Sequence, residues 1–361
     1  MRKIVFVIES LSGGGAERVT AALANTLCAQ MDYEIHLIVY TRDPQRDYPT
    51  DSRIIWHEVS CLGGSRLGRI MRRVFQIRQT VKDIRPDCVV SLGTALIMAP
   101  LSAAMAGLKV PLILSERNDP RRFPVKKAHR ALRMIYYFFC DGLVFQTEEA
   151  RSYFPKVMRK KSCVICNPIS DHLPPRFEGT REKKVVNFCR LSPQKNIPLL
   201  MDAFSDIADE FPQHTLHIYG DGPERMKLEE KVQEIGLGDR IFVHPRSAQI
   251  HKEIYKAAMF VSSSDYEGIS NSMLEAIAMG IPTICTDCPA GGARETINHG
   301  ENGLLVPTGN RAALADAMRM LLKDPVLAYK MGIAGTALRD QLHVRNIAKK
   351  WMIFINQFSI V

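Results

Sequence analysis

The sequence lacks a hydrophobic run long enough to cross a bilayer, which takes about 20 consecutive apolar residues. Its most apolar aromatic stretch, Met134 to Cys140, is bracketed by Arg133 and Asp141. Aromatic residues make up 7% and charged residues 24% of the 361 positions, a balance typical of a globular protein. We therefore expect any membrane contact to be peripheral.

A clustered set of metal ligands is also missing. The nine cysteines are scattered, and the pairs Cys163 with Cys166 and Cys285 with Cys288 have no His cluster or matching second pair nearby. A closed zinc site needs about four ligands at compact spacing. We interpret these cysteines as structural thiols in a reducing cytoplasm, because the chain opens with a strand rather than a signal peptide. No metal or cofactor is expected.

Acidic residues are scarce in the first half of the chain. Residues 1–166 contain 26 Lys and Arg against 15 Asp and Glu, which accounts for the whole net charge of +10. Such a one-sided field favours a polyanionic partner: a phosphorylated lipid, an anionic bilayer or a nucleic acid. Since no recognised nucleic-acid-binding module accompanies the charge, no nucleic acid is expected as a partner.

Strand-length apolar runs alternate with helical patterns, which predicts parallel α/β sheets. The first series predicts strands at 3–8, 34–39, 88–91, 112–115 and 142–146, and helices that include 17–29, 66–84 and 127–139; the pattern pauses after 164–166. A second series predicts strands at 184–189, 215–219, 240–243, 258–262 and 283–286.

The two series indicate two domains, because 361 residues exceed what one core usually holds. We predict an N-terminal Rossmann-like domain over 1–168 that binds an acceptor, and a C-terminal Rossmann-like domain over 169–342 that binds a donor. The loop 173–180 is the candidate linker. A final helix within 343–361 is expected to pack back on the first domain. Two such doubly wound domains would face a central cleft and bind ligands at the carboxyl ends of their strands.

A glycine-rich turn follows the first strand as Gly13-Gly14-Gly15-Ala16-Glu17-Arg18. Glycine lets a backbone approach a ligand, and the helix that follows offers free N–H groups to a phosphate. Arg18 stands where a G-x-G-x-x-G fingerprint ends, so a dinucleotide site is disfavoured. An anion site and a merely tight turn both remain open.

Two further segments carry candidate chemistry. Arg190 follows a predicted strand and Lys195 comes five residues later, so the two cations could neutralise a diphosphate, unless they are simply solvated surface charges. Glu267 lies in a loop after a strand, and Glu275 lies on a helix that Ser270 would cap. One carboxylate could hold sugar hydroxyls while the other grips a ribose. The alternative is a capped surface helix with incidental acids.

Together these segments resemble the group 1 glycosyltransferases, family 4 in the usual sequence classification. The resemblance covers essentially the whole chain and implies an α/β GT-B fold with retaining, nucleotide-sugar-dependent and metal-independent transfer. Its marks are the glycine-rich turn, Arg190-Leu191 with Lys195-Asn196, Gly220-Asp221-Gly222-Pro223, and the Glu-x7-Glu pair of Glu267 and Glu275.

The resemblance assigns roles to individual residues. Arg190 and Lys195 would bind the donor diphosphate and stabilise the departing nucleotide, Glu267 would contact the donor sugar beside its anomeric carbon, and Glu275 would take the ribose hydroxyls. The remaining donor-binding residues would be Gly14, Gly15, Gly220, Gly268, Ile269, Ser270 and Asn271. Transfer on the front face of the sugar is implied.

One position departs from the family. Many relatives carry a first-domain His that contacts the donor sugar, and Arg117 occupies that place in Glu116-Arg117-Asn118-Asp119. A guanidinium is a poor general base. Arg117 would therefore only bind acceptor phosphate or donor oxygen, and the leaving phosphate itself would accept the acceptor's proton.

The acceptor is expected to be anionic. Arg66, Arg69 and Arg73 are spaced to share one face of a helix that also carries an apolar stripe through Leu67, Ile70, Met71, Val74 and Ile77. Such a helix suits a diphosphate headgroup or an anionic membrane, although a buried stripe with a solvated basic face explains it too. A second basic group, which includes Arg121, Arg122 and Arg133, favours a polyprenyl-diphosphate-linked glycan.

These features together predict a hexosyltransferase. It would move a hexose or N-acetylhexosamine, from a UDP-linked donor by overall resemblance, to a lipid-linked glycan of a surface polysaccharide, lipopolysaccharide or glycoprotein. The expected location is the inner face of the plasma membrane. A nucleotide-sugar epimerase would need no basic acceptor surface, and a non-enzymatic membrane protein would need no paired glutamates.

Overall fold

The computed structural model describes residues 2–31, 33–59 and 63–358. The chain forms two compact units. The first unit contains the residues up to Pro168 together with the segment from Val344 onward, and the second unit runs from Ile169 to His343. The predicted C-terminal segment 343–361 thus includes the start of this returning segment, although its last three residues lie outside the described part.

The first unit is built on a parallel sheet whose described strands follow the order β3-β2-β1-β4-β5-β6-β7. The strands are β1 (Lys3–Ile8), β2 (Glu34–Val39), β3 (Ile55–Glu58), β4 (Cys88–Ser91), β5 (Leu112–Ser115), β6 (Gly142–Phe145) and β7 (Ser162–Val164). Two strands, β3 and β7, were not predicted from the sequence. They lie at the two edges of the sheet, and their side chains are half-exposed or exposed, so neither has a buried apolar run.

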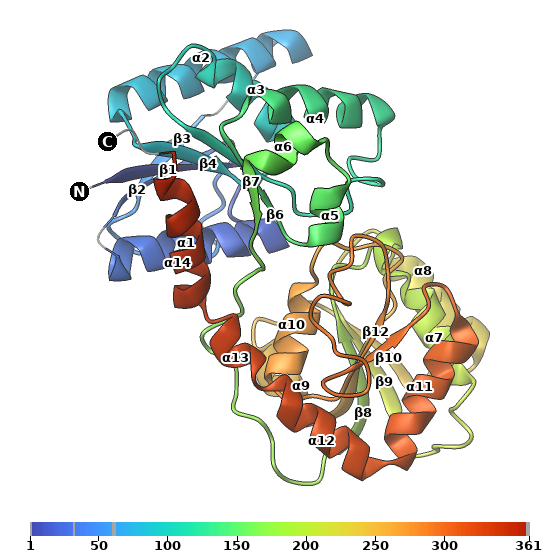
Figure 1. Cartoon of the computed structure of the whole chain (residues 1–361). Coiled ribbons are helices and arrows are strands. Elements are labelled where there is room, and N and C mark those ends of the chain that lie inside the picture. The colour runs from blue at the N-terminus through green and yellow to red at the C-terminus, as the bar shows by residue number, and fades with distance from the viewer. Residues whose placement is uncertain (1, 32, 60–62, 359–361) are drawn as a thin grey trace. The chain divides into compact units, whose positions relative to one another are not determined.

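Helices cover both faces of this sheet (Figure 1). On one face α3 packs between α2 and α4, and on the other α1 packs against α14. The helices of this unit are α1 (Gly15–Gln30), α2 (Arg66–Ile84), α3 (Ala95–Met105), α4 (Lys127–Phe139), α5 (Glu148–Ser152), α6 (Lys156–Lys160) and α14 (Val344–Asn356). The last helix buries Trp351 and six other side chains in the first unit.

The second unit has a parallel sheet in the order β10-β9-β8-β11-β12-β13. Its strands are β8 (Glu182–Phe188), β9 (Thr215–Tyr219), β10 (Ile241–His244), β11 (Ala257–Ser262), β12 (Thr283–Thr286) and β13 (Leu304–Val306). Of these strands, only β13, a three-residue edge strand, was not predicted from the sequence. The two parallel α/β units give the predicted GT-B fold class.

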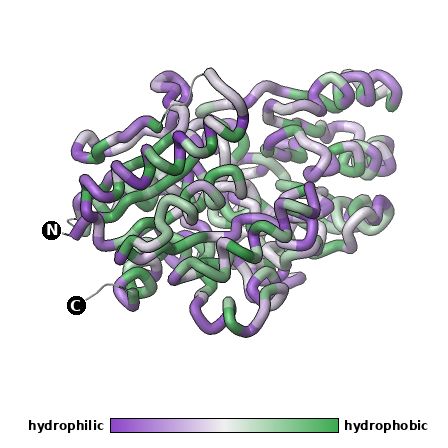
Figure 2. The backbone as a smooth tube through the Cα atoms, turned by 90° about the horizontal axis from the view of Figure 1, so that it is seen from above, coloured by the Kyte–Doolittle hydropathy of each residue, from purple (hydrophilic) through white to green (hydrophobic). Residues whose placement is uncertain are grey.

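The second unit's helices are η1 (Pro193–Lys195), α7 (Ile197–Ser205), α8 (Arg225–Ile235), α9 (Ile250–Ile254), α10 (Asn271–Ala278), α11 (Arg311–Lys323), α12 (Pro325–Gly335) and α13 (Leu338–Gln341). Figure 2 shows hydrophobic stretches along the strands and alternating polar and apolar positions along many helices. That pattern is expected where helices bury one stripe against a sheet. Within the described ranges, no helix is long and apolar enough to span a membrane.

Strand order defines a switch point in each sheet. The chain passes from β1 outward to β2 and β3 and then returns to β4 on the other side of β1. In the second unit, β8 separates β9 from β11 in the same way. Ligands of doubly wound sheets bind beyond the carboxyl ends of the strands at such a reversal. The loops after β8 and β11 are therefore where a ligand site of the second unit is expected.

Candidate active site

The loop after β11 presents Glu267 beside the loop after β8, which presents Lys195. The two side chains form an ion pair, and Ser264 Oγ donates a hydrogen bond to the same carboxylate oxygen at 3.0 Å. Burial alone would lower the pKa of Lys195, but the charge of Glu267 raises it above its ordinary value. Lys195 is thus a fixed cation, held in the site by Glu267.

Further hydrogen bonds join the same two loops. Gln194 Nε2 donates to the carbonyl of Tyr266 at 2.8 Å, and the Asp265 amide donates to the carbonyl of Gln194 at 2.9 Å. The Asn196 amide donates to Asp265 at 2.8 Å, with Asn196 in the left-handed region at a φ of 44°. Because η1 is tied at these points, Lys195 has little freedom to leave Glu267 by loop movement.

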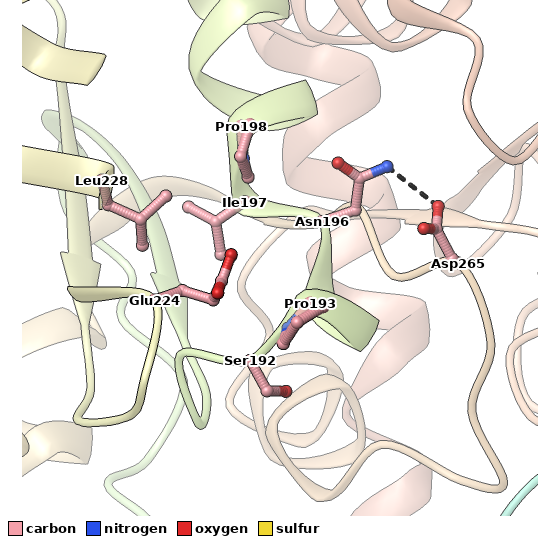
Figure 3. A pocket seen from close by; sticks show the side chains of 8 residues that line it. All are labelled: Ser192, Pro193, Asn196, Ile197, Pro198, Glu224, Leu228 and Asp265. Carbon is pink, nitrogen blue, oxygen red and sulfur yellow. Dashed lines mark hydrogen bonds between the residues drawn. The ribbon is translucent and has the colours of Figure 1, made fainter. Parts of the chain in front are cut away.

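A pocket of about 170 Å³ lies beside the loops that follow β8 and β11. Figure 3 shows the Asn196 side chain turned towards Asp265, with Ile197 and Leu228 on the other side and Glu224 between them and Ser192. None of these residues was predicted as a site residue. The pocket exposes the outer side of the η1 turn that carries Lys195.

Arg190 lies two residues after the end of β8, and its side chain is exposed. The neighbouring glycines pack against the backbone beside it. A Cβ on Gly220 would lie 1.9 Å from the carbonyl oxygen of Cys189, and one on Gly222 would lie 2.1 Å from that of Leu191. Gly220, predicted to bind the donor, is thus required here for the close approach of the two strand ends.

Glu275 lies on helix α10, which follows the loop that carries Glu267. Ser270 caps the helix as predicted, its hydroxyl accepting a hydrogen bond from the Met273 amide at 3.4 Å. Glu275 is 1% exposed, and His251 Nε2 lies 2.9 Å from its Oε2. His251 was not predicted as a site residue. It lies on a five-residue helix, and nothing in that short segment indicates a contact with a carboxylate 24 residues later.

The remaining predicted donor residues follow the turn into α10. Gly268, Ile269 and Ser270 are buried, and Asn271 is half-buried. The backbone here is closely packed, since a Cβ on Gly292 would lie 1.8 Å from the carbonyl oxygen of Gly268. Glycine at position 292 allows the two backbones to touch.

The glycine-rich turn of the first unit leads into α1, with Gly14 as N-cap and Gly15 as its first residue. A Cβ on Gly14 would lie 1.9 Å from a carboxylate oxygen of Glu17. The Glu17 side chain therefore folds back over the start of α1. A bound anion at this helix N-terminus would have to displace that carboxylate.

Arg117 turns into the first unit. Its guanidinium donates to Asn167 and, at 3.4 Å, to the Ser115 hydroxyl, and burial lowers its pKa to about 10. It remains a cation at neutral pH, which agrees with the expectation that it does not act as a base. Binding a substrate would require Arg117 to exchange these internal partners.

Arg133 corrects the prediction of a second basic surface group. It is 1% exposed and donates to Glu116 Oε2 at 2.7 Å and to the carbonyls of Pro120 and Phe123 at 2.7 Å each. Burial raises the pKa of Glu116, although Arg133 opposes that rise. Arg133 is therefore part of the core, whereas Arg121 and Arg122 are exposed.

The predicted basic face of α2 is divided in the same way. Arg66 and Arg69 are exposed, but Arg73 is half-buried with its guanidinium 4.2 Å from the centre of the Tyr40 ring. The predicted apolar stripe also changes along the helix, because Leu67 and Met71 are exposed while Ile77 is buried. Its first turns thus present basic and apolar side chains together.

The cysteines near the site are thiols. Cys189, Cys285 and Cys288 surround the Lys195 and Glu267 pair closely enough to interact electrostatically with it. Burial raises the pKa of Cys189 and of Cys288 to about 12. They are protonated and poorly nucleophilic at neutral pH.

Models of two glycosyltransferase families match consecutive parts of this chain. A model of glycosyltransferase family 4 matches residues 13–173, and a model of glycosyl transferases group 1 matches residues 168–337. The chain is a group 1 glycosyltransferase. This membership decides against the epimerase and the non-enzymatic membrane protein.

The similarity of this glycosyltransferase to its relatives covers nearly its whole length. An α-1,4-N-acetyl-D-galactosaminyltransferase of Campylobacter jejuni, named for an acceptor built on diphosphoundecaprenol, is 26% identical over 98% of both chains. The amylovoran biosynthesis glycosyltransferase AmsD of Erwinia amylovora is 23% identical over 99% of this chain and 100% of its own. Anabaena HepE, solved with UDP and glucose, is 19% identical and has the same fold, with a TM-score of 0.84 over 99% of this chain and 100% of its own.

Proposed function

We propose that the enzyme transfers a hexose or N-acetylhexosamine from a UDP-sugar, with retention, to a lipid-linked glycan in surface glycan biosynthesis. The observation that carries this proposal is the Lys195–Glu267 pair at the switch point of the second unit, with Arg190 at the end of the neighbouring strand. The names of the Campylobacter and Anabaena relatives support the lipid-diphosphate acceptor and the uridine nucleotide.

The donor diphosphate would exchange places with Glu267 as the partner of Lys195. Arg190 and Lys195 would then carry the charge of the departing nucleotide, a task that pre-positioned cations perform well in a partly dehydrated site. Glu267, released from Lys195, would stand beside the anomeric carbon. The acceptor hydroxyl would attack from the face that the nucleotide leaves, and the leaving phosphate would take its proton.

The acceptor would bind the first unit. Arg66, Arg69, Arg121 and Arg122 are exposed there, and guanidinium groups form bidentate contacts with phosphate oxygens. Arg73 and Arg117 are less accessible because Tyr40 and Asn167 already engage them. We place the enzyme peripherally on the inner face of the plasma membrane, where a nucleotide sugar and a lipid-linked glycan meet.

Calorimetric titration with UDP, GDP and their sugars in the presence of EDTA tests the donor site. We expect one nucleotide to bind without metal, and binding to fall by more than about a hundredfold when Arg190 and Lys195 are both changed to Ala, since each charged contact contributes roughly 1.5–3 kcal/mol. If neither nucleotide bound, even with a lipid diphosphate present, the proposed function would be wrong. Binding that required a divalent cation would overturn the metal-independent mechanism.

His251 provides a finer test of the ribose contact. We expect His251→Ala to weaken nucleotide binding about tenfold, because Glu275 loses a charge-assisted hydrogen bond that orients it. His251→Gln, which keeps a donor, should restore part of the affinity. The 2′-deoxy nucleotide should bind both variants and the wild type nearly equally. Equal losses for the ribose and deoxyribose forms would show that His251 does not act through Glu275.

A further inference from the structure

Helix α4 is oriented with its apolar side outward. Leu132, Ile135, Phe138 and Phe139 are 41%, 56%, 53% and 73% exposed, whereas Arg133 on the same helix is 1% exposed. A surface helix of a globular domain normally shows the opposite arrangement. Two adjacent phenylalanines and an isoleucine in water indicate a surface that meets something apolar.

The orientation of α4 is fixed from inside. Arg133 bonds to Glu116 and to the carbonyls of Pro120 and Phe123, and the Tyr137 hydroxyl donates to the same Glu116 carboxylate at 3.3 Å. A half-turn of the helix about its axis would expose these groups and leave Glu116 buried without its cation. The outward apolar face is therefore built into the core of the first unit.

Basic residues border this face. Residues 120–140 contain six Lys and Arg and no Asp or Glu, and Lys126 and Lys127 at the start of α4 are exposed. In the same layer of helices, the first turns of α2 expose Leu67, Met71 and Phe75 beside Arg66 and Arg69. Apolar side chains bordered by cations complement the acyl and headgroup layers of an anionic bilayer.

We infer that α4 inserts its outer face into the headgroup and acyl boundary of an anionic membrane, through Leu132, Ile135, Phe138 and Phe139. This inference rests on the proposed lipid-linked acceptor for its purpose, but on the surface itself for its evidence. A second copy of the chain is a poorer occupant, because a symmetric contact through this face would bring two sets of cations together.

Insertion of α4 would also position the acceptor-binding loop. The segment from Glu116 to Phe123 is bonded to α4 through Arg133, and it carries Arg121 and Arg122. A bilayer that holds the helix therefore also holds the loop that carries these two arginines. The membrane contact and the proposed acceptor contact are two parts of one rigid feature.

The test is flotation of the full-length protein with vesicles of phosphatidylcholine alone or mixed with phosphatidylglycerol. We expect the wild type to float with the anionic vesicles, and Ile135→Ser combined with Phe139→Ser to bind them at least tenfold more weakly, since burial of each removed apolar group contributes to partition. The matched control is Met226→Ser with Ile333→Ser, two exposed apolar residues of the second unit, and it should bind like the wild type.

A second variant guards against a folding defect. Phe139→Trp should be quenched by nitroxide-labelled acyl chains beyond the level seen with the wild type, whose own tryptophans supply the background. Unchanged flotation of the double variant, or absence of extra quenching, would overturn the inference. A double variant that floats normally but no longer dimerises in sedimentation would assign the face to a second copy instead.

The inference and the proposed function fail separately. Anionic vesicle binding by α4 without any nucleotide binding would leave the inference standing and remove the function. Nucleotide binding and sugar transfer by a wild type that ignores anionic vesicles would do the reverse. If both hold, the double variant should lose transfer to acceptor in vesicles while keeping transfer to a detergent-dispersed acceptor.

Discussion

Replacing Glu267 by Ala is expected to slow sugar transfer about a hundred- to a thousandfold, the loss that follows removal of one pre-positioned charged group from an active site. Nucleotide affinity should be unchanged or higher, because Lys195 no longer has to leave a carboxylate to meet the diphosphate. Lys195→Ala should slow transfer comparably but weaken nucleotide binding. Rates and affinities measured on the same preparations separate the two roles.

Glu234→Ala is a suitable control for these variants, because Glu234 is an exposed carboxylate on α8. Glu267→Gln is the informative intermediate, since it retains an oxygen for the Ser264 hydroxyl but loses the charge. Transfer at the wild-type rate in Glu267→Ala would show that this carboxylate does not act at the anomeric carbon. Weaker nucleotide binding in that variant would contradict the exchange of partners at Lys195.

Replacing Arg133 by Met should destabilise the first unit by about 3–5 kcal/mol, the usual result of leaving one member of a buried ion pair behind. The loss should show as a shift of the first unit's transition in urea unfolding. Arg69→Met, which removes an exposed arginine from α2, should change stability little. A double change to Arg133→Met and Glu116→Gln should recover part of the loss, because no charge is then left buried.

The same substitution predicts a pH dependence. Burial raises the pKa of Glu116 above its ordinary 4.5, and removing Arg133 removes the main charge that opposes this rise. The folded variant then binds a proton more tightly than the unfolded chain does. The destabilisation relative to the wild type that comes from Glu116 is therefore smallest at low pH and grows as the pH rises through the folded-state pKa of this carboxyl group. A loss that was the same at pH 5 and pH 8 would contradict this account.

Much of the fold could be read from the sequence because its central strands are continuous apolar runs. Strands such as β1 and β5 are buried between layers of helices, and their limits agree with the predicted ones. The edge strands β3, β7 and β13 were not predicted because they are short, and the side chains of β3 and β7 are half-exposed or exposed. An edge strand is defined by its neighbour rather than by its own composition.

The site was only partly visible in the sequence. Motif spacing placed Lys195 and Glu267 in loops after strands, but a pairing across 72 positions depends on the strand order β8-β11. Arg133 shows the opposite difficulty, since composition placed it with the exposed cations and the fold buries it. A charged side chain can be buried when a buried group of opposite charge, such as Glu116 for Arg133, is available as its partner.

Because of helix α14, the first unit is built from two segments that are separated in the sequence by the whole second unit. Helix α14 follows the second unit in the chain but belongs to the first unit, where it packs against α1 and buries Trp351 and Phe354. The second unit is therefore fully synthesised while the first unit still lacks one of the two helices, α1 and α14, that pack together on one face of its sheet. A chain that stopped before Val344 would contain the whole second unit, but its first unit would expose the apolar side chains that α14 covers.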